Sequence, residues 1–451
     1  MAPTLLGIVV VLTAGHAWSG PVLPVASMES LVTRAVNDDA AALSAARGFR
    51  GGRPLVVRVL DRPHLRAEHD AALRAARSPG AADAESRLQA LLGLGGQEPA
   101  TGGAPARGAD VTGFYDPVSK RVYVGNWVSF VDGRAARLKD IAEALLDRRF
   151  PVTERPRRGH ELPRDADGEG DTLWARMALL EGDATVQTLE RLSPGGGMPP
   201  TPALADELDG VRQTMVAEEQ GSPGLDLARR LFVALDGTAF VASVRARAPW
   251  SVVNQLWEHP PVSTEQVLHP EKYLRHEAPD DVAARLPKRP PGATGPDDVV
   301  YSDTLGELGV RAFLQRAVGD YKAQRAATGW GGDRVRLQRG PPAGEAAAVE
   351  YVTWVTTWDE ASDAQDFAEQ AGQTLALLAG GRLTEVTPRR RAPPGPRDAR
   401  RWRTADARGR IFALEWQGRA VTLLLGAPSS AERSLPALTA AATRRGRPTS
   451  R

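Results

Sequence analysis

The stretch Arg134–Phe150, RAARLKDIAEALLDRRF, constrains the fold of this chain more than any other segment. Its apolar residues recur along one face, at Leu138, Ile141, Ala142, Leu145 and Leu146. This spacing predicts an amphipathic helix with one buried side. Lys139 and Glu143 are four positions apart, so the helix brings their side chains to one side, with Asp140 next to Lys139 in the chain.

The composition is that of an ordinary globular protein. Of the 451 residues, 42% are hydrophobic and 25% are charged, and this length suits two or three domains. The formal net charge of +2 is close to balance, so we predict no nucleic-acid partner. We interpret the arginine-rich runs at 389–403 and 444–447 as solvated loops. The absence of cysteine excludes disulfides, thiolate metal ligands and a cysteine nucleophile.

The N-terminus has features of an export signal. Leu5–Ala14 is an apolar run that is too short to span a bilayer of ~30 Å as a helix. Small residues follow at Gly15 and Ala17, as expected for a signal peptide at residues 1–17. The first four residues carry no Lys or Arg, so an uncleaved apolar segment or a mis-assigned start stays open. We predict export to the periplasm or the medium, without an integral membrane span.

The order of the predicted elements indicates an α+β protein. Val111–Tyr115 and Arg121–Trp127 form a predicted β-hairpin, which leads into the helix described above. A second helix is expected at Leu173–Leu192 after the capping pair Asp171-Thr172, and a third at Leu305–Ala326. We divide the chain into a mostly helical first domain, residues 24–334, and a small C-terminal α+β domain, residues 345–445.

The residues at the helix centre favour an ion cluster over a metal site. A zinc-peptidase helix needs two imidazoles one turn apart, a glutamate base beside the first, and a third ligand from another helix. Lys139 and Glu143 have that spacing, and Glu181 lies on the second helix, in LLEGDAT. The Lys139 ammonium has no lone pair and repels Zn²⁺. We therefore predict that Lys139 replaces the metal as counter-ion of Glu143 and Glu181. Each stretch alone also fits an ordinary helix surface.

Five segments in order resemble a family of exported bacterial proteins of the gluzincin-like zinc metallopeptidase type. The segments are VTGFYDPVSKRVYVGNW, LKDIAEALLDRRF, ALLEGDAT, PPVSTEQVLHPEKY and GWGGDR, within about Val111–Arg334. In that family the metal helix reads HELTHALQDQHF and a later helix reads EGDA. The resemblance implies a zincin-like first domain. It places Lys139 and Glu143 on the ligand histidines, Asp140 on the base and Glu181 on the third ligand. Both imidazoles and the base are substituted, so the resemblance does not imply activity.

Three histidines lie in sequences that resemble parts of a functional site. His160-Glu161 looks like half of a metal motif, but the nearby Pro163 forbids the helix that the motif needs. We interpret His259 and His269, which flank the sequence STEQ, as structural histidines.

The STEQ sequence itself has two interpretations. Ser263, Thr264 and Glu265 could form a nucleophile set. Ser263 could instead cap a helix, with Gln266 closing a capping box, and we favour this cap.

Together these observations predict a non-catalytic pseudo-metallopeptidase. It would be exported, would hold no zinc or other cofactor, and would bind or scaffold an unidentified protein or peptide at the cell envelope. One alternative is an active metal-dependent hydrolase that uses Asp140, Glu143 and Glu181 in a non-standard site. The other is a structural protein without a functional cleft.

Overall fold

The computed structural model describes residues 25–76, 79–95, 111–129, 131–150, 170–193, 197, 201–218, 224–287, 298–340, 349–386 and 399–443. These residues form an α+β protein, which confirms the predicted fold class. The predicted signal peptide lies outside the described residues. No helix within the described ranges combines the length and the apolar content needed to cross a bilayer.

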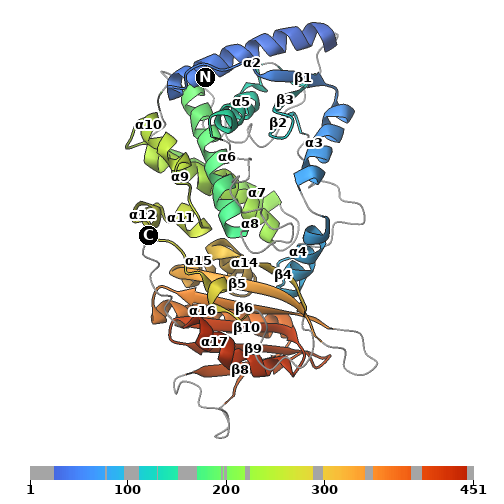
Figure 1. The fold of residues 1–451 in the computed structure, drawn as a ribbon, viewed down its shortest axis with the longest axis vertical. Coiled ribbons are helices and arrows are strands. Elements are labelled where there is room, and N and C mark those ends of the chain that lie inside the picture. The colour runs from blue at the N-terminus through green and yellow to red at the C-terminus, as the bar shows by residue number, and fades with distance from the viewer. Residues whose placement is uncertain are drawn as a thin grey trace.

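A three-stranded sheet with its helices occupies one end of the molecule (Figure 1). The elements are α2 (Val25–Arg47), β1 (Val56–Leu60), α3 (Arg62–Ala76), β2 (Gly113–Asp116), β3 (Arg121–Gly125) and α5 (Arg134–Arg149). The strand order is β1-β3-β2, with β1 parallel and β2 antiparallel to β3. The predicted hairpin is therefore present, and Asp116 pairs with Arg121 across it. Alternating valines of β1 and β3 pack with the apolar faces of α2 and α5.

A group of helices fills the middle of the molecule around the long helix α6 (Figure 1). Its elements are α6 (Gly170–Leu192), α7 (Thr201–Glu218), α8 (Leu225–Leu231), the π-helix η1 (Phe232–Asp236), α9 (Gly237–Arg245), α10 (Trp250–Val253), the 3₁₀-helix η2 (Asn254–Trp257), α11 (Thr264–Leu268) and α12 (Pro270–Leu274). Leu179, Phe232 and Phe240 lie in their common core and are almost fully buried. The core therefore fixes α6 on several sides.

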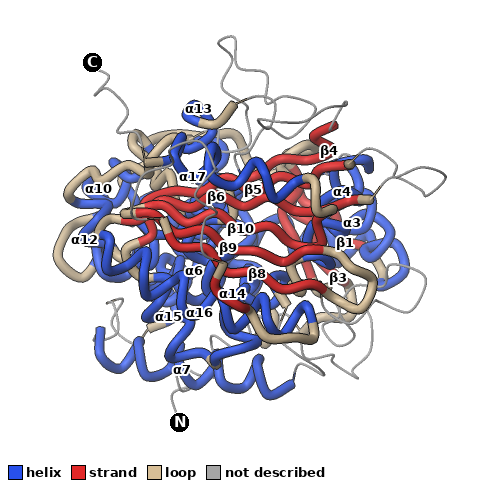
Figure 2. Tube along the Cα trace, turned by 90° about the horizontal axis from the view of Figure 1, so that it is seen from below, coloured by secondary structure: helices blue, strands red, loops and turns tan. Residues whose placement is uncertain are grey.

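A seven-stranded antiparallel sheet forms the other end (Figures 1 and 2). Its strand order is β4-β5-β6-β10-β9-β8-β7. Its strands are β4 (Asp298–Asp303), β5 (Trp330–Arg339), β6 (Glu350–Trp358), β7 (Thr384–Glu385), β8 (Arg400–Ala405), β9 (Ile411–Gln417) and β10 (Ala420–Ala427). One face packs against α4 (Pro79–Leu91), α14 (Gly306–Val318), α15 (Asp320–Ala327) and α16 (Ala361–Ala379). The other face packs against α13 (Val282–Arg285), the 3₁₀-helix η3 (Ala431–Ser434) and α17 (Leu435–Ala442). Because helices cover both faces, the central strands β6 and β10 are buried along almost their whole length.

The sheet begins earlier in the chain than the predicted C-terminal domain. We placed the division between residues 334 and 345, but β5 pairs with β6 from Trp330 to Arg339. Residues 298–340 therefore share one sheet and one core with the C-terminal strands. The start of β5 was hard to recognise because Gly331 and Gly332 interrupt its side-chain pattern, at a break in register.

The single helix predicted at Leu305–Ala326 is wrong. The structure has two helices, α14 and α15, with Gly319 between them at φ 78°. Glycine adopts this left-handed conformation readily, whereas a side chain would make it sterically unfavourable. The change in backbone direction at Gly319 ends α14.

Candidate functional site

Two neighbouring helices, α5 and α6, carry the predicted site residues (Figure 1). The predicted apolar face of α5 is buried: Leu138, Ile141, Ala142 and Leu146 are 0% exposed, and Leu145 is 5% exposed. Burial of this face against the small sheet sets the rotation of α5 about its axis. It thereby turns Lys139 and Glu143 toward α6, which carries Glu181.

Lys139 lies between the two glutamates. Its Nζ is 3.2 Å from Glu143 Oε1 and 3.0 Å from both carboxylate oxygens of Glu181. The side chains of Lys139, Glu143 and Glu181 are 17%, 17% and 23% exposed, respectively. The structure therefore brings these three predicted residues into one half-buried ion cluster that still reaches solvent.

Burial and charge act in opposite directions on the cluster. Burial alone would lower the pKa of Lys139, but the charges of Glu143, Glu181 and Asp140 outweigh it and raise that pKa. Burial also raises the pKa of Glu143. The Lys139 ammonium opposes this rise and the Glu181 carboxylate adds to it, with a net upward shift. Lys139 therefore stays charged, while the carboxyl groups compete for its single positive charge.

Asp140, at the predicted general-base position, is only 6% exposed. It lies close to β2, where a Cβ added to Gly113 would be 3.1 Å from Asp140 Oδ2. Burial raises the pKa of Asp140 well above its usual value of 3.8, and the neighbouring charge of Glu143 raises it further. Asp140 is thus a buried carboxyl group that binds a proton more readily than an exposed one.

Asp140→Asn is expected to flatten the pH dependence of stability. Because the pKa of Asp140 is raised in the folded state, the native protein binds a proton that the unfolded chain releases above about pH 4. Stability is therefore lost as the pH rises from the unfolded pKa through the folded one, and the variant avoids this loss. Urea unfolding at pH 5 and pH 8 should show a relative gain for the variant of about 1 kcal/mol at the higher pH. The control is Asp83→Asn, whose side chain is 69% exposed. If the free energy of unfolding depended on pH equally in the two variants, the raised pKa of Asp140 would be contradicted.

The cluster does not fit a zinc ion. Among the described residues, no group of three or more His, Cys, Asp or Glu side chains is arranged to hold a metal. The ammonium of Lys139 already bridges Glu143 and Glu181, and it has no lone pair to donate. The carboxylates of Glu143 and Glu181 also have no imidazole or thiolate beside them of the kind that zinc prefers.

Asp183 of the EGDAT sequence has a structural role. Its Oδ2 accepts hydrogen bonds from Arg47 at 3.1 Å and from the Trp257 indole at 2.8 Å, and its Oδ1 accepts one from Gln187 at 3.1 Å. The Arg47 and Asp183 side chains are both 0% exposed. Arg47 also donates to Asn254 Oδ1 at 2.6 Å. This network ties α2 and η2 to α6. Our sequence interpretation missed Arg47, Asn254 and Trp257 as partners of this helix.

Gly182 of the same sequence permits a close helix crossing. A Cβ added there would lie 2.1 Å from the carbonyl oxygen of Gly237 on α9, far inside any allowed contact. A Cβ added to Gly237 would in turn lie 2.2 Å from the carbonyl oxygen of Ala178. The residues of EGDAT therefore divide their roles: Glu181 joins the ion cluster, while Gly182 and Asp183 hold α6 in place.

Ser263 caps α11, as predicted. The backbone N–H of Gln266 donates to Ser263 Oγ at 3.2 Å. The Gln266 side chain accepts a hydrogen bond from the Val262 N–H at 2.8 Å. In a standard capping box the donor would be the N–H of the cap residue, Ser263, which is one residue later. Ser263 and Thr264 are 0% exposed and Glu265 is 2% exposed, so a substrate could not reach them as a nucleophile set.

Asp171, which we predicted to cap α6, instead lies inside that helix. Its Oδ1 accepts from the Thr264 backbone N–H at 3.1 Å and from the Thr264 hydroxyl at 2.6 Å. Burial raises the pKa of Asp171 well above its usual range. The residue joins α6 to α11, and this contact could not be recognised from the local sequence.

A second lysine-centred cluster joins the helices to the large sheet. Lys272 Nζ lies 2.6 Å from Glu265, 3.0 Å from Glu277 and 2.5 Å from Asp359. Burial raises the pKa of Glu265 to about 8, although the hydrogen bond and charge of Lys272 oppose the rise. Because Asp359 directly follows β6, this cluster fixes α12 against the end of that strand.

Within the part of the chain that the structure describes, the histidines do not assemble a metal site. His269 Nε2 lies 3.0 Å from Glu307 Oε1, which also accepts from Arg311 Nε at 3.0 Å. This hydrogen bond to Glu307 raises the pKa of His269. His269 therefore has a structural partner, His259 is exposed, and His160-Glu161 lies outside the described residues.

Comparison with known proteins identifies only a C-terminal similarity. Residues 297–435 match a family model described as Domain of unknown function (DUF8575). The match runs from the start of β4 to the start of α17, and it does not include α5 or α6. No curated protein and no solved structure matches the chain.

Proposed function

We propose that this chain is a non-catalytic relative of zinc metallopeptidases in which a lysine has replaced the metal. The observation that carries the proposal is the position of Lys139 Nζ, within 3.0–3.2 Å of both Glu143 and Glu181. An ammonium at the centre of two carboxylates supplies the positive charge that a metal would otherwise provide. The order of the hairpin, α5 and α6 supports the same ancestry.

The proposed role is binding or scaffolding of a protein or peptide after export to the cell envelope. A solvent-accessible cluster between α5 and α6 suits recognition, because its charged groups keep 17–23% of their surface exposed. The apolar run and small residues near the N-terminus support export.

An active hydrolase that uses Asp140, Glu143 and Glu181 is the weaker alternative. Such an enzyme needs a metal ion to activate water, and the metal would have to displace the Lys139 ammonium. Asp140 is also almost fully buried, at 6% exposure, so it is poorly placed to take a proton from water in a cleft.

Zinc analysis of tag-free protein tests the proposal. After incubation with excess ZnCl₂ and desalting, the protein should retain less than about 0.1 zinc per chain and should not cleave labelled casein. The proposal would be contradicted if the wild type retained about one zinc per chain and the double variant Glu143→Gln/Glu181→Gln did not. If the double variant still retained zinc, that zinc would be bound outside the cluster of Lys139, Glu143 and Glu181, and the proposal for the cluster would stand.

A further inference from the structure

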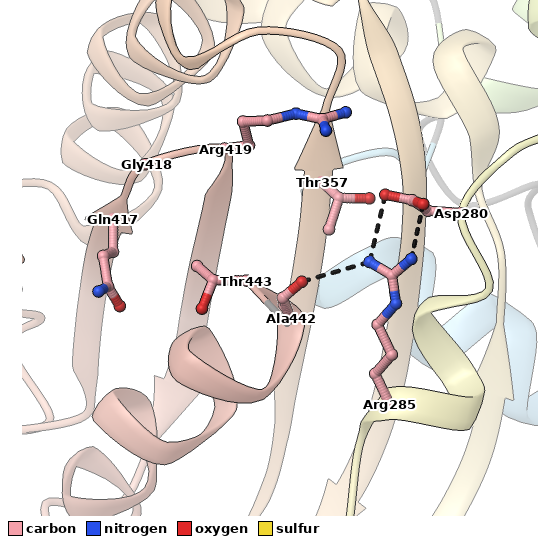
Figure 3. A pocket seen from close by; sticks show the side chains of 8 residues that line it. All are labelled: Asp280, Arg285, Thr357, Gln417, Gly418, Arg419, Ala442 and Thr443. Carbon is pink, nitrogen blue, oxygen red and sulfur yellow. Dashed lines mark hydrogen bonds and ion pairs between the residues drawn. The ribbon is translucent and has the colours of Figure 1, made fainter. Parts of the chain in front are cut away.

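An open pocket of about 460 Å³ lies on the face of the large sheet that α17 covers (Figure 3). Four separate segments line it, with the residues Asp280, Arg285, Thr357, Gln417, Gly418, Arg419, Ala442 and Thr443. The first two belong to α13 and the turn before it, while the others come from β6, the β9–β10 turn and the end of α17. Its volume is in the range of small-molecule sites.

Arg419 is held rigidly at this pocket. It lies in the tight turn after Gln417, where Gly418 adopts φ 56° and Gln417 pairs with Ala420. The carbonyl oxygen of Arg419 accepts from the Trp358 N–H at 3.0 Å, and its Nε donates to the Trp358 carbonyl oxygen. Among the described residues, the two terminal nitrogens of Arg419 have no protein partner. The free end of the guanidinium is therefore available to a ligand.

Arg285, on another wall, is already neutralised. Its Nη2 donates to Asp280 Oδ1 at 2.6 Å, and its Nη1 donates to Asp280 Oδ2 at 3.2 Å and to the Ala442 carbonyl oxygen at 3.3 Å (Figure 3). Asp280 is fixed in turn, because its N–H donates to the Gly331 carbonyl oxygen at 2.6 Å. The glycines of the GWGGDR sequence permit this approach: a Cβ on Gly332 would lie 2.6 Å from the Asp280 carbonyl oxygen. Among the pocket residues, one positive charge, on Arg419, remains unpaired.

We propose that this pocket binds a small molecule with a single carboxylate, through the terminal nitrogens of Arg419. The two nitrogens can donate parallel hydrogen bonds to both carboxylate oxygens. One unpaired guanidinium balances one carboxylate and leaves a phosphate dianion under-compensated. Thr357 and Gln417 add polar groups for the rest of the ligand. The region similar to the family of unknown function supplies Thr357 and Arg419, whereas Asp280, Arg285 and Thr443 lie outside it.

Binding of N-acetylglycine, with its neutral amide N-acetylglycinamide as the matched probe, tests the proposal. At about 20 mM and constant ionic strength, N-acetylglycine should raise the melting temperature of the full chain by about 2 °C, and the amide should not. Arg419→Gln should weaken binding at least about tenfold by calorimetry, and Arg419→Lys should lie between Gln and wild type. Arg400→Gln, an exposed arginine on β8 with 51% side-chain exposure, should bind as wild type does.

Three outcomes would overturn the proposal. One is the absence of binding to the folded wild-type chain, and a second is equal binding by Arg419→Gln and Arg400→Gln. The third is tighter binding of inorganic phosphate than of N-acetylglycine through Arg419, which would reject the carboxylate. Circular dichroism shows whether Arg419→Gln folds. If it does not, Arg419→Lys replaces it as the test, because lysine keeps the charge and changes only the geometry of the hydrogen-bond donors.

Discussion

Lys139→Met is expected to lower the free energy of unfolding by about 2–4 kcal/mol at pH 8, because it leaves two half-buried carboxylates without a counter-ion. Glu143 and Glu181 each lie within 3.2 Å of the ammonium that the substitution removes. The loss should be smaller at pH 5, because the raised pKa of Glu143 lets it take up a proton there. Urea unfolding at both pH values measures the effect.

Two controls separate this effect from a general loss of packing. Lys139→Met/Glu143→Gln/Glu181→Gln removes the three charges together, and its stability should return to within about 1 kcal/mol of wild type. Lys322→Met changes an exposed lysine on α15 and should cost less than about 0.5 kcal/mol. Calcium in the millimolar range should stabilise Lys139→Met but not the triple variant, because only the former has free carboxylates. If Lys139→Met were as stable as Lys322→Met, the lysine would not be the counter-ion.

The parts of the fold with local signals could be predicted from the sequence. Helical spacing identified the buried face of α5, and turn residues identified the β2–β3 hairpin. The four-residue spacing of Lys139 and Glu143 also predicted their contact. The contact between Lys139 and Glu181 spans 42 positions. It was expected only from the resemblance of the segments to a family of zinc metallopeptidases.

The long-range contacts had no comparable signal. Asp183 meets Arg47, 136 positions earlier, and Trp257, 74 positions later, and nothing in the local sequence of any of them indicates a partner. The Arg419 pocket is likewise assembled from four distant segments. The boundary of the sheet was placed too late for the same reason, since only pairing with β6 reveals β5 as a strand. Contacts between residues far apart in the chain depend on the whole fold, so they cannot be predicted from any single segment.

Replacing Lys139 and Glu143 on α5 with histidines is expected to create a zinc site there. In Lys139→His/Glu143→His, two neutral imidazoles one helical turn apart face Glu181, which gives the His₂Glu donor set of many zinc enzymes. We expect about one zinc per chain with a dissociation constant of about 1 μM or tighter, measured by calorimetry with a competing chelator. The same variant with Glu181→Ala should bind at least about tenfold more weakly.

Adding Asp140→Glu to these two substitutions tests hydrolysis separately from metal binding. A Cβ on Gly113 would lie 3.1 Å from Asp140 Oδ2, so the longer glutamate meets the β2 backbone and has little room to move. We therefore expect zinc binding to survive this third change while casein cleavage stays weak, because the base is held away from the metal-bound water. A folded two-histidine variant that bound no zinc would show that Lys139 and Glu143 do not occupy former ligand positions. The lysine cluster would then be an ordinary ion pair between two helices, and the proposed descent from a metal site would fail with it.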